Sequence, residues 1–74
     1  MKVKVKLFAT LRQDRFAEQE FEVENGTDVD FLLQKFNLKR EEVPIIFING
    51  RHADFDAVLR ENDDIAFFPP IGGG

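Results

Sequence analysis

The sequence has 74 residues, nine of which are phenylalanine, and it contains no tryptophan, tyrosine or cysteine. A chain of this length forms one small domain, and the lack of cysteine excludes a disulfide framework, a thiol nucleophile and a thiolate metal site. The formal net charge of −4 argues against nucleic acid as a partner, because nucleic-acid phosphates require a basic surface.

The N-terminal segment predicts a strand and not a targeting sequence. Residues 2–8 alternate, with Val3, Val5 and Leu7 on one side and three lysines on the other. This alternation is typical of a half-buried strand whose apolar side faces a core. The segment does not resemble a signal peptide, and no apolar run in the chain is long enough to span a bilayer. We therefore expect a cytoplasmic protein with no membrane partner.

A second alternating segment, residues 20–24, predicts a strand that pairs with the first. Phe21 and Val23 would face the core, and three glutamates would face solvent. Antiparallel pairing would then set three lysines against three glutamates, at about 0.2–1 kcal/mol for each pair, which helps to fix the register. The connection between the strands, residues 9–19, is too long for a tight turn and predicts a short helical turn.

Residues 28–37 predict the main helix of the domain. Its apolar side chains fall at positions i, i+3, i+4 and i+7 and form one stripe, Val29, Leu32, Leu33 and Phe36. Phe31 points away from that stripe. Thr27 is the expected N-cap, with Asp30 returning the contact as a variant of the capping box.

The segment after the helix predicts a hairpin. Residues 45–48 form a continuous apolar run, which indicates a strand buried on both faces. Asn49-Gly50 predicts a type I′ turn, because both central residues of that turn need positive φ, and residues 51–53 return as a short strand. Residues 54–59 predict an irregular or helical turn with three packing side chains, Phe55, Val58 and Leu59.

The last predicted strand, residues 65–68, places an aromatic side chain on the open face of the sheet. If Ile65 and Phe67 face the helix, then Phe68 faces the other way, as Phe8 does. Two large aromatic side chains on a face otherwise occupied by charge predict an interaction patch. Scattered exposed apolar residues without a function are the alternative, and they are common on protein surfaces.

The chain ends with Phe-Phe-Pro-Pro-Ile-Gly-Gly-Gly, residues 67–74. Each proline fixes its own φ and holds the preceding residue extended, which makes a stiff stem, whereas glycine reaches almost any φ. Residues 71–74 could extend roughly 13 Å at about 3.3 Å per residue. We expect a domain of residues 1–70 and a flexible tail, 71–74, that carries the α-carboxylate of Gly74 outward. An ordinary frayed chain end is the alternative.

This ending resembles the C-terminal signature of the MoaD family, the small sulfur-carrier subunit of molybdopterin synthase. That signature reads Phe-Phe-Pro-Pro, an aliphatic residue, a small or polar residue, and Gly-Gly. Gly72 takes the variable position, and Gly73-Gly74 the functional diglycine. The run Phe8-Ala9-Thr10-Leu11-Arg12 is also similar to an aromatic-Ala-x-aliphatic-Arg run of the family.

The resemblance covers essentially the whole chain and implies its fold. The residue patterns alone predict a helix on a small mixed sheet, which is an α+β domain. The resemblance adds the strand order of the ubiquitin-like β-grasp. This fold has a mixed sheet of four to five strands with one main helix across one face, and its first and last strands run parallel at the centre.

The resemblance also implies that the chain is a carrier and not an enzyme. A MoeB-like or ubiquitin-activating-type enzyme would use ATP to adenylate Gly74, and a sulfur donor would convert it to a thiocarboxylate. The tail would then give its sulfur to a pterin precursor in a MoaE-like large synthase subunit, for molybdenum cofactor biosynthesis. The chain itself would bind no cofactor and no metal. The residues implied in partner binding are Phe8, Leu59, Phe68, Pro69, Pro70, Ile71 and Gly72.

Three other functions stay open on the sequence. A ubiquitin-like protein modifier would share the activation of Gly74 but would pass it to a lysine amine. A ThiS-type carrier would serve thiazole synthesis, although the Phe-Phe-Pro-Pro stem is more similar to MoaD. A plain binding module would make no use of the tail, so that deletion of Gly74 would leave its activity intact.

Overall fold

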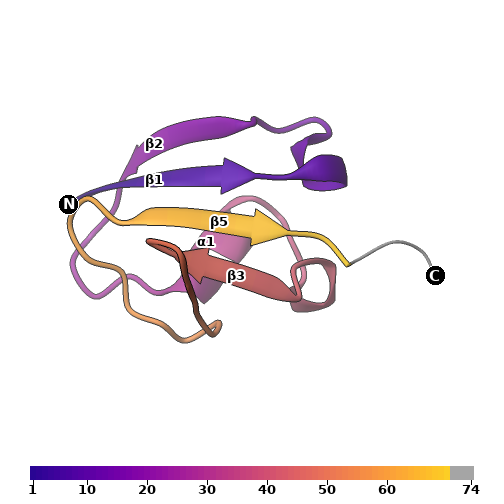
Figure 1. Cartoon of the computed structure of the whole chain (residues 1–74). Helices are drawn as coiled ribbons and strands as arrows, with labels where there is room; N and C mark the ends of the chain where they lie inside the picture. The colour runs from indigo at the N-terminus through magenta and orange to yellow at the C-terminus, as the bar shows by residue number, and fades with distance from the viewer. Residues whose placement is uncertain (71–74) are drawn as a thin grey trace.

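One mixed β-sheet with an α-helix across one face forms the domain (Figure 1). The computed structural model describes residues 1–70, so the predicted tail, residues 71–74, lies outside the described residues. The strands are β1 Lys2–Leu7, β2 Glu18–Glu22, β3 Ile45–Ile48, β4 Arg51–His52 and β5 Asp64–Phe68. The helix, α1, spans Val29–Lys35, and two short 3-10 helices, η1 Ala9–Arg12 and η2 Arg40–Glu42, lie in the connections.

The strand order is β2-β1-β5-β3-β4, with the first and last strands side by side at the centre. β1 and β5 run parallel, and Val5 lies opposite Ile65. The two other main pairings, β1 with β2 and β3 with β5, are antiparallel. This order confirms the predicted β-grasp, and it places β5, the strand that leads to the tail, between two neighbours.

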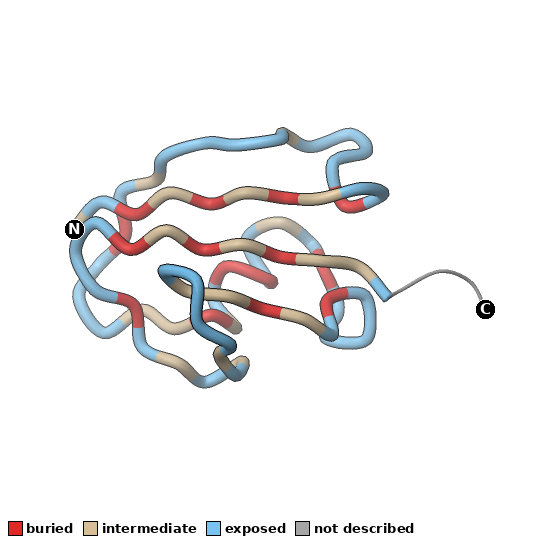
Figure 2. Tube along the Cα trace, in the orientation of Figure 1, coloured by how far each residue is buried: buried red, intermediate tan, exposed pale blue. Residues whose placement is uncertain are grey.

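The core lies between α1 and the inner face of the sheet. Figure 2 shows buried and less buried residues alternating along β1 and β5, as the period of a half-buried strand requires. The buried side chains from these two strands are Val3, Val5, Leu7, Ile65 and Phe67, and those from the helix are Val29, Leu32 and Leu33. Each fully buried side chain of this kind contributes about 1.5–3 kcal/mol to folding. The predicted inner faces of β1, β5 and α1 are therefore confirmed.

The second strand begins and ends two residues earlier than predicted. Its glutamates pair with the lysines of β1 in the register Lys2–Glu22, Lys4–Glu20 and Lys6–Glu18. The predicted opposition of three lysines and three glutamates is thus confirmed, but with Glu18 in place of Glu24. Glu24 instead accepts hydrogen bonds from the backbone N–H and the hydroxyl of Thr27, which begin the turn into the helix.

The N-cap of α1 is Asp28, and the prediction of Thr27 was wrong. Asp28 has extended backbone angles, φ −113° and ψ 177°, and its carboxylate accepts a hydrogen bond from the N–H of Phe31 at 3.0 Å. The predicted return contact from Asp30 is also absent, because that carboxylate pairs with Arg40. Asp28 lies in an isolated β-bridge with Val58, which keeps the chain extended for one residue more than the sequence pattern suggested.

Replacement of Asp28 by alanine is expected to destabilise the domain by about 0.5–2 kcal/mol, because one N–H of the first helical turn loses its acceptor. Urea unfolding followed by circular dichroism measures this change. The matched variant Asp30→Ala loses only the ion pair with Arg40 at the surface, so its free energy of unfolding should fall by about 0–1 kcal/mol. An equal or larger loss for Asp30→Ala would contradict the assignment of Asp28 as the cap.

The hairpin of β3 and β4 confirms the predicted turn but corrects the burial of β3. Asn49 and Gly50 have φ values of 53° and 81°, as a type I′ turn requires. Only Ile46 of β3 is fully buried, at 2% exposure, because no layer of the described chain covers the outer face of the sheet. In the segment after β4, Leu59 is buried and Phe55 half-buried, but the predicted packing of Val58 was wrong, since Val58 is 60% exposed.

Candidate functional site

The stem of the predicted tail begins at the end of the central strand. β5 ends at Phe68, and Pro69 and Pro70 follow in the sequence. Figure 1 shows the end of β5 close to one edge of the domain. The Phe67 carbonyl oxygen accepts a hydrogen bond from the N–H of Phe8 at 3.2 Å, so β1 and β5 stay in contact up to the start of the stem. The fold therefore fixes the origin of the stem by pairing on both sides of β5.

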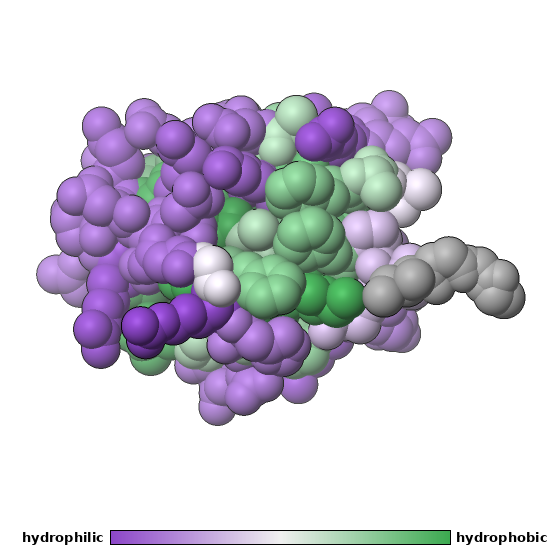
Figure 3. All heavy atoms as spheres, viewed as in Figure 1, coloured by the Kyte–Doolittle hydropathy of each residue, from purple (hydrophilic) through white to green (hydrophobic). Residues whose placement is uncertain are grey.

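Three phenylalanines gather on the outer face of the sheet beside this origin, and we call Phe8, Phe47 and Phe68 the phenylalanine cluster. The rings of Phe8 and Phe68 stack with their centres 4.4 Å apart and an interplanar angle of 10°. Phe47 meets Phe68 edge-on at 5.7 Å and 90°. All three side chains are half-buried. Figure 3 shows the resulting apolar area on this face, next to the hydrophilic surface of β1 and β2.

The cluster confirms that Phe8 and Phe68 share the outer face, and it adds Phe47, which the sequence analysis missed. Phe47 lies opposite Ala66 on the neighbouring strand β5. Strict alternation along β3, with Ile46 facing the core, would have placed Phe47 outward. The continuous apolar run hid this signal, because it indicated a strand buried on both faces.

A hollow of about 470 Å³ lies at the cluster. Its apolar lining is the phenylalanine cluster with Ala66, and its polar lining includes Lys6, Asn49 and Asp64. The Lys6 ammonium pairs with the Asp64 carboxylate at 3.4 Å, so the two charges at this edge offset each other. The outer face thus offers an apolar depression with a neutralised polar rim, which suits a protruding apolar side chain of another protein.

Leu59 does not belong to this surface, and its predicted role in partner binding needs correction. Its side chain is only 3% exposed and packs in the core. Its N–H donates to the carbonyl oxygen of Thr27 at 2.8 Å, which holds the segment against the entry of α1. A side chain buried in the core cannot contact a partner on the outer face of the sheet.

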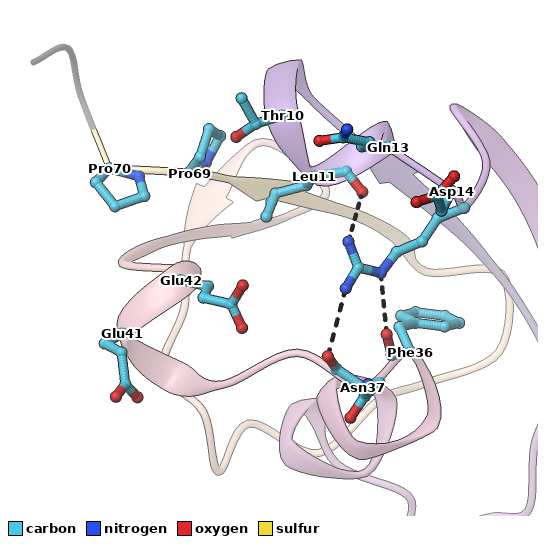
Figure 4. A pocket seen from close by; sticks show the side chains of 11 residues that line it. Thr10, Leu11, Gln13, Asp14, Phe36, Asn37, Glu41, Glu42, Pro69 and Pro70 are labelled. Carbon is cyan, nitrogen blue, oxygen red and sulfur yellow. Dashed lines mark hydrogen bonds between the residues drawn. The ribbon is translucent and has the colours of Figure 1, made fainter.

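A second hollow, of about 620 Å³, lies beside the stem (Figure 4). Pro69 and Pro70 form one side, and the other residues come from η1 and the loop after it, the end of α1, and η2. Its carboxylates are Asp14, Glu41 and Glu42. Within residues 1–70 none of the three takes part in an ion pair. Pro69 and Pro70 therefore lie beside a group of three carboxylates that form no ion pair within the described residues.

Arg15 joins the two sides of this hollow. Its guanidinium donates to the carbonyl oxygens of Leu11, Phe36 and Asn37, at 3.2, 3.0 and 3.4 Å (Figure 4). Two of these acceptors lie at the C-terminal end of α1, where a positive charge is favourable. Arg15 therefore has a structural role, and its charge is directed toward the backbone and not toward a ligand.

The described residues contain neither a candidate metal site nor a membrane-spanning helix. Within residues 1–70, no group of three or more His, Cys, Asp or Glu side chains is placed to hold a metal ion. No helix among those residues is long and apolar enough to cross a membrane. The predicted sites Ile71, Gly72, Gly73 and Gly74 lie outside the described residues, so their roles stay predictions.

The chain is similar in sequence to a known protein family. The sequence profile of the ThiS family matches residues 5–74. A protein of Mycobacterium tuberculosis named molybdopterin synthase sulfur carrier subunit is 35% identical over an alignment of 82 positions. The alignment covers 100% of this chain and 99% of that protein.

Two solved structures are similar over nearly the whole chain. One, from Pyrococcus furiosus, is named as a candidate subunit 1 of a molybdopterin converting factor. It is 32% identical with a TM-score of 0.76, and the match covers 96% of this chain and 99% of that one. The other is small archaeal modifier protein 1 from Methanosarcina acetivorans. It is 29% identical with a TM-score of 0.71, and the match covers 99% and 96%.

Proposed function

This chain belongs to the ThiS family, and we propose that it is a sulfur carrier for the synthesis of molybdopterin. The observation that carries the proposal is the full-length match, tail included, to a relative named molybdopterin synthase sulfur carrier subunit. The geometry supports it, because a paired central strand leads directly into the stem and an apolar surface lies beside that point. The reacting group is the carboxylate of Gly74.

Activation of Gly74 needs an ATP-dependent enzyme, because a carboxylate is a poor electrophile. Its oxygen attacks the α-phosphorus of ATP, which releases pyrophosphate and leaves a mixed anhydride with AMP. A persulfide on a sulfur donor then attacks the carbonyl carbon and displaces AMP. A thiolate cleaves the resulting sulfur–sulfur bond, so that Gly74 keeps one sulfur as a thiocarboxylate and the donor side becomes a disulfide.

Each part of the chain has a distinct role in this sequence of steps. Glycine at positions 73 and 74 adds no side chain to a narrow partner tunnel or to the tetrahedral intermediate. Pro69 and Pro70 lower the entropy lost when the tail is ordered on a partner. Ile71 and Gly72 extend the reach of the tail from the stem. The acid, base and metal groups of the reactions belong to the partner proteins.

The phenylalanine cluster is the docking surface for these partners. The activating enzyme and the large synthase subunit both have to receive the tail, and the cluster lies where the stem begins. The two partners therefore bind one after the other and not together. A few well-packed side chains near the centre of an interface carry most of the binding free energy, and aromatic anchors are common among them.

Intact-protein mass spectrometry tests the proposal directly. The chain is incubated with an activating enzyme, ATP and a sulfur donor, and we expect a product in which one oxygen has been replaced by sulfur at the C-terminus. The product is then mixed with the large subunit and a pterin precursor, and molybdopterin should form. A chain that stays unmodified, with every partner shown to be active on a known carrier, would contradict the proposal.

Protein modification is a second candidate function, and the similarity to small archaeal modifier protein 1 favours it. In this reaction a lysine amine of a target attacks the activated Gly74 and forms an amide. Activation is common to both functions, so the discriminating measurement is an immunoblot for lysine-linked conjugates in cells. Bands that disappear in a chain lacking Gly74 would support modification, and molybdopterin formation alone would support the carrier function.

Replacement of Phe8 by arginine is expected to weaken binding to the large synthase subunit by about tenfold or more, because a charge replaces an apolar anchor. Loss of the stacking with Phe68 should cost about 0.5–1.5 kcal/mol of stability, which leaves the domain folded. Isothermal titration calorimetry and thermal melting measure the two effects.

The matched control for Phe8→Arg is Phe31→Arg. Phe31 is 49% exposed and lies on α1, across the core from the phenylalanine cluster. The same change of side chain there should leave the affinity unchanged. Wild-type affinity for Phe8→Arg would remove the cluster from the docking surface.

A further inference from the structure

We propose that Arg12 binds a carboxylate of the large synthase subunit when the two proteins associate. The inference rests on the proposed function, because it concerns the same docking surface. It adds a charged contact of defined geometry to the apolar side chains of the phenylalanine cluster.

Arg12 is held at one end of the phenylalanine cluster. It is the last residue of η1, and its Nε–H donates to the carbonyl oxygen of Leu7, the last residue of β1, at 2.7 Å. Its guanidinium carbon lies 5.6 Å from the centre of the Phe8 ring, within the range of a cation–π contact. Phe8 in turn stacks on Phe68, the residue before the stem. The guanidinium is therefore oriented before any partner arrives.

The terminal N–H groups of Arg12 make no hydrogen bond within residues 1–70. Within residues 1–70, the hydrogen bond from Nε is the only one that its side chain makes, and no ion pair involves it. The neighbouring cation Lys6 pairs with Asp64, and Arg15 donates to three carbonyl oxygens. Arg12 is exposed, so its outer edge is open to a partner.

A partner that covers the cluster must supply an acceptor for this group. Covering Phe8 also removes water from the guanidinium that lies over its ring, and an ion buried without a counter-charge is strongly destabilising. A carboxylate is the matching group, because its two oxygens accept parallel N–H bonds from the planar guanidinium fork. We therefore assign to Arg12 a glutamate or aspartate on the facing surface of the large subunit.

The phosphate of the acyl adenylate is another anion in the proposed pathway, and it does not fit this position. The adenylate forms on Gly74, which an extended tail carries up to roughly 13 Å beyond Pro70. Arg12 lies on the body of the domain, beside the start of the stem. A partner surface that contacts the body reaches Arg12, whereas a group at the tip of an extended tail does not.

Calorimetric binding of the large subunit, measured over a series of salt concentrations, tests the inference. Arg12→Leu should weaken binding about tenfold and should show a smaller dependence of affinity on salt, because one interfacial charge pair is lost. Arg12→Lys keeps the positive charge but loses the planar guanidinium group, so its affinity for the large subunit should lie between those of Arg12→Leu and the wild type. The control, Arg60→Leu, removes an exposed arginine before β5, at the other end of that strand from the stem, and should bind as the wild type does.

Several outcomes would overturn the inference. Wild-type affinity and salt dependence for a folded Arg12→Leu would show that no charged partner group meets Arg12. Arg12→Leu could fail to fold, because the Leu7 carbonyl oxygen has lost its hydrogen-bond donor. In that case Arg12→Lys is the test, and wild-type affinity of Arg12→Lys for the large subunit would exclude recognition of the planar guanidinium group. Slower adenylation with unchanged affinity for the large subunit would assign Arg12 to the phosphate. A wild-type chain that does not bind the large subunit would contradict the proposed function, and the inference would fall with it.

Discussion

A chain whose Gly74 carboxylate is replaced by a carboxamide is expected to form no thiocarboxylate and to support no synthesis of molybdopterin. An amide has no anionic oxygen to attack ATP, so the acyl adenylate cannot form and every later step is blocked. The core that holds the domain together lies within residues 1–70, so the thermal unfolding midpoint should change by no more than about 1 °C. Mass spectrometry after activation, together with thermal melting, measures both results.

Two further changes separate the chemistry of the carboxylate from the shape of the tail. Gly74→Ala keeps the carboxylate and adds one methyl group, so a loss of activity there reports crowding in the partner and not a missing nucleophile. Removal of Gly74 leaves a chain that again ends in two glycines, Gly72 and Gly73, but is shorter by about 3.3 Å. We expect both variants to lose activity without unfolding.

The carboxamide is the decisive member of this series. Full activity of a chain with a blocked carboxylate would refute the proposed function. A large fall in the unfolding temperature of any tail variant would instead show that the tail stabilises the domain.

Alternation in the sequence predicted the central part of the fold and part of the site. The period of two along β1 and β5 decides which side chains face the helix, and the structure confirms this for Leu7 and Phe67. The same period places the next residues, Phe8 and Phe68, on the outer face, where they stack. Local alternation sufficed because both strands have one buried and one open face.

The errors arose where contacts distant in sequence decide the outcome. Asp28 replaces Thr27 as the helix cap because a bridge to Val58 keeps it extended. The residue pattern predicted Leu59 as a packing side chain, which the structure confirms, but its partner-binding role came from the resemblance, and its burial in the core excludes that role. The contact of Arg12 with Phe8 is local and was not predicted either, because it depends on the backbone geometry of η1, which the residue types alone do not specify. No pattern within a single segment carries this information.

Two adjacent residues of β5 are expected to respond to substitution in opposite ways. Phe67 is fully buried, and Phe67→Ala should destabilise the domain by about 3–5 kcal/mol. That loss is comparable to the total stability expected for a domain of this size, which is at the low end of about 5–15 kcal/mol. Phe68→Arg should cost about 0.5–1.5 kcal/mol through lost ring contacts, but it should weaken binding to the large subunit by about tenfold or more.

Urea unfolding and calorimetric binding, applied to both variants, separate a core role from a docking role. Phe67→Leu keeps an apolar side chain and should recover most of the stability, which controls for the loss of packing alone. If Phe68→Arg unfolds as readily as Phe67→Ala, the phenylalanine cluster belongs to the folding core, and weaker binding would then be a consequence of unfolding. If it folds and binds as the wild type does, partners recognise the tail without the outer face of the sheet. Only a folded variant with weakened binding is consistent with a docking surface that lies one residue away from the core.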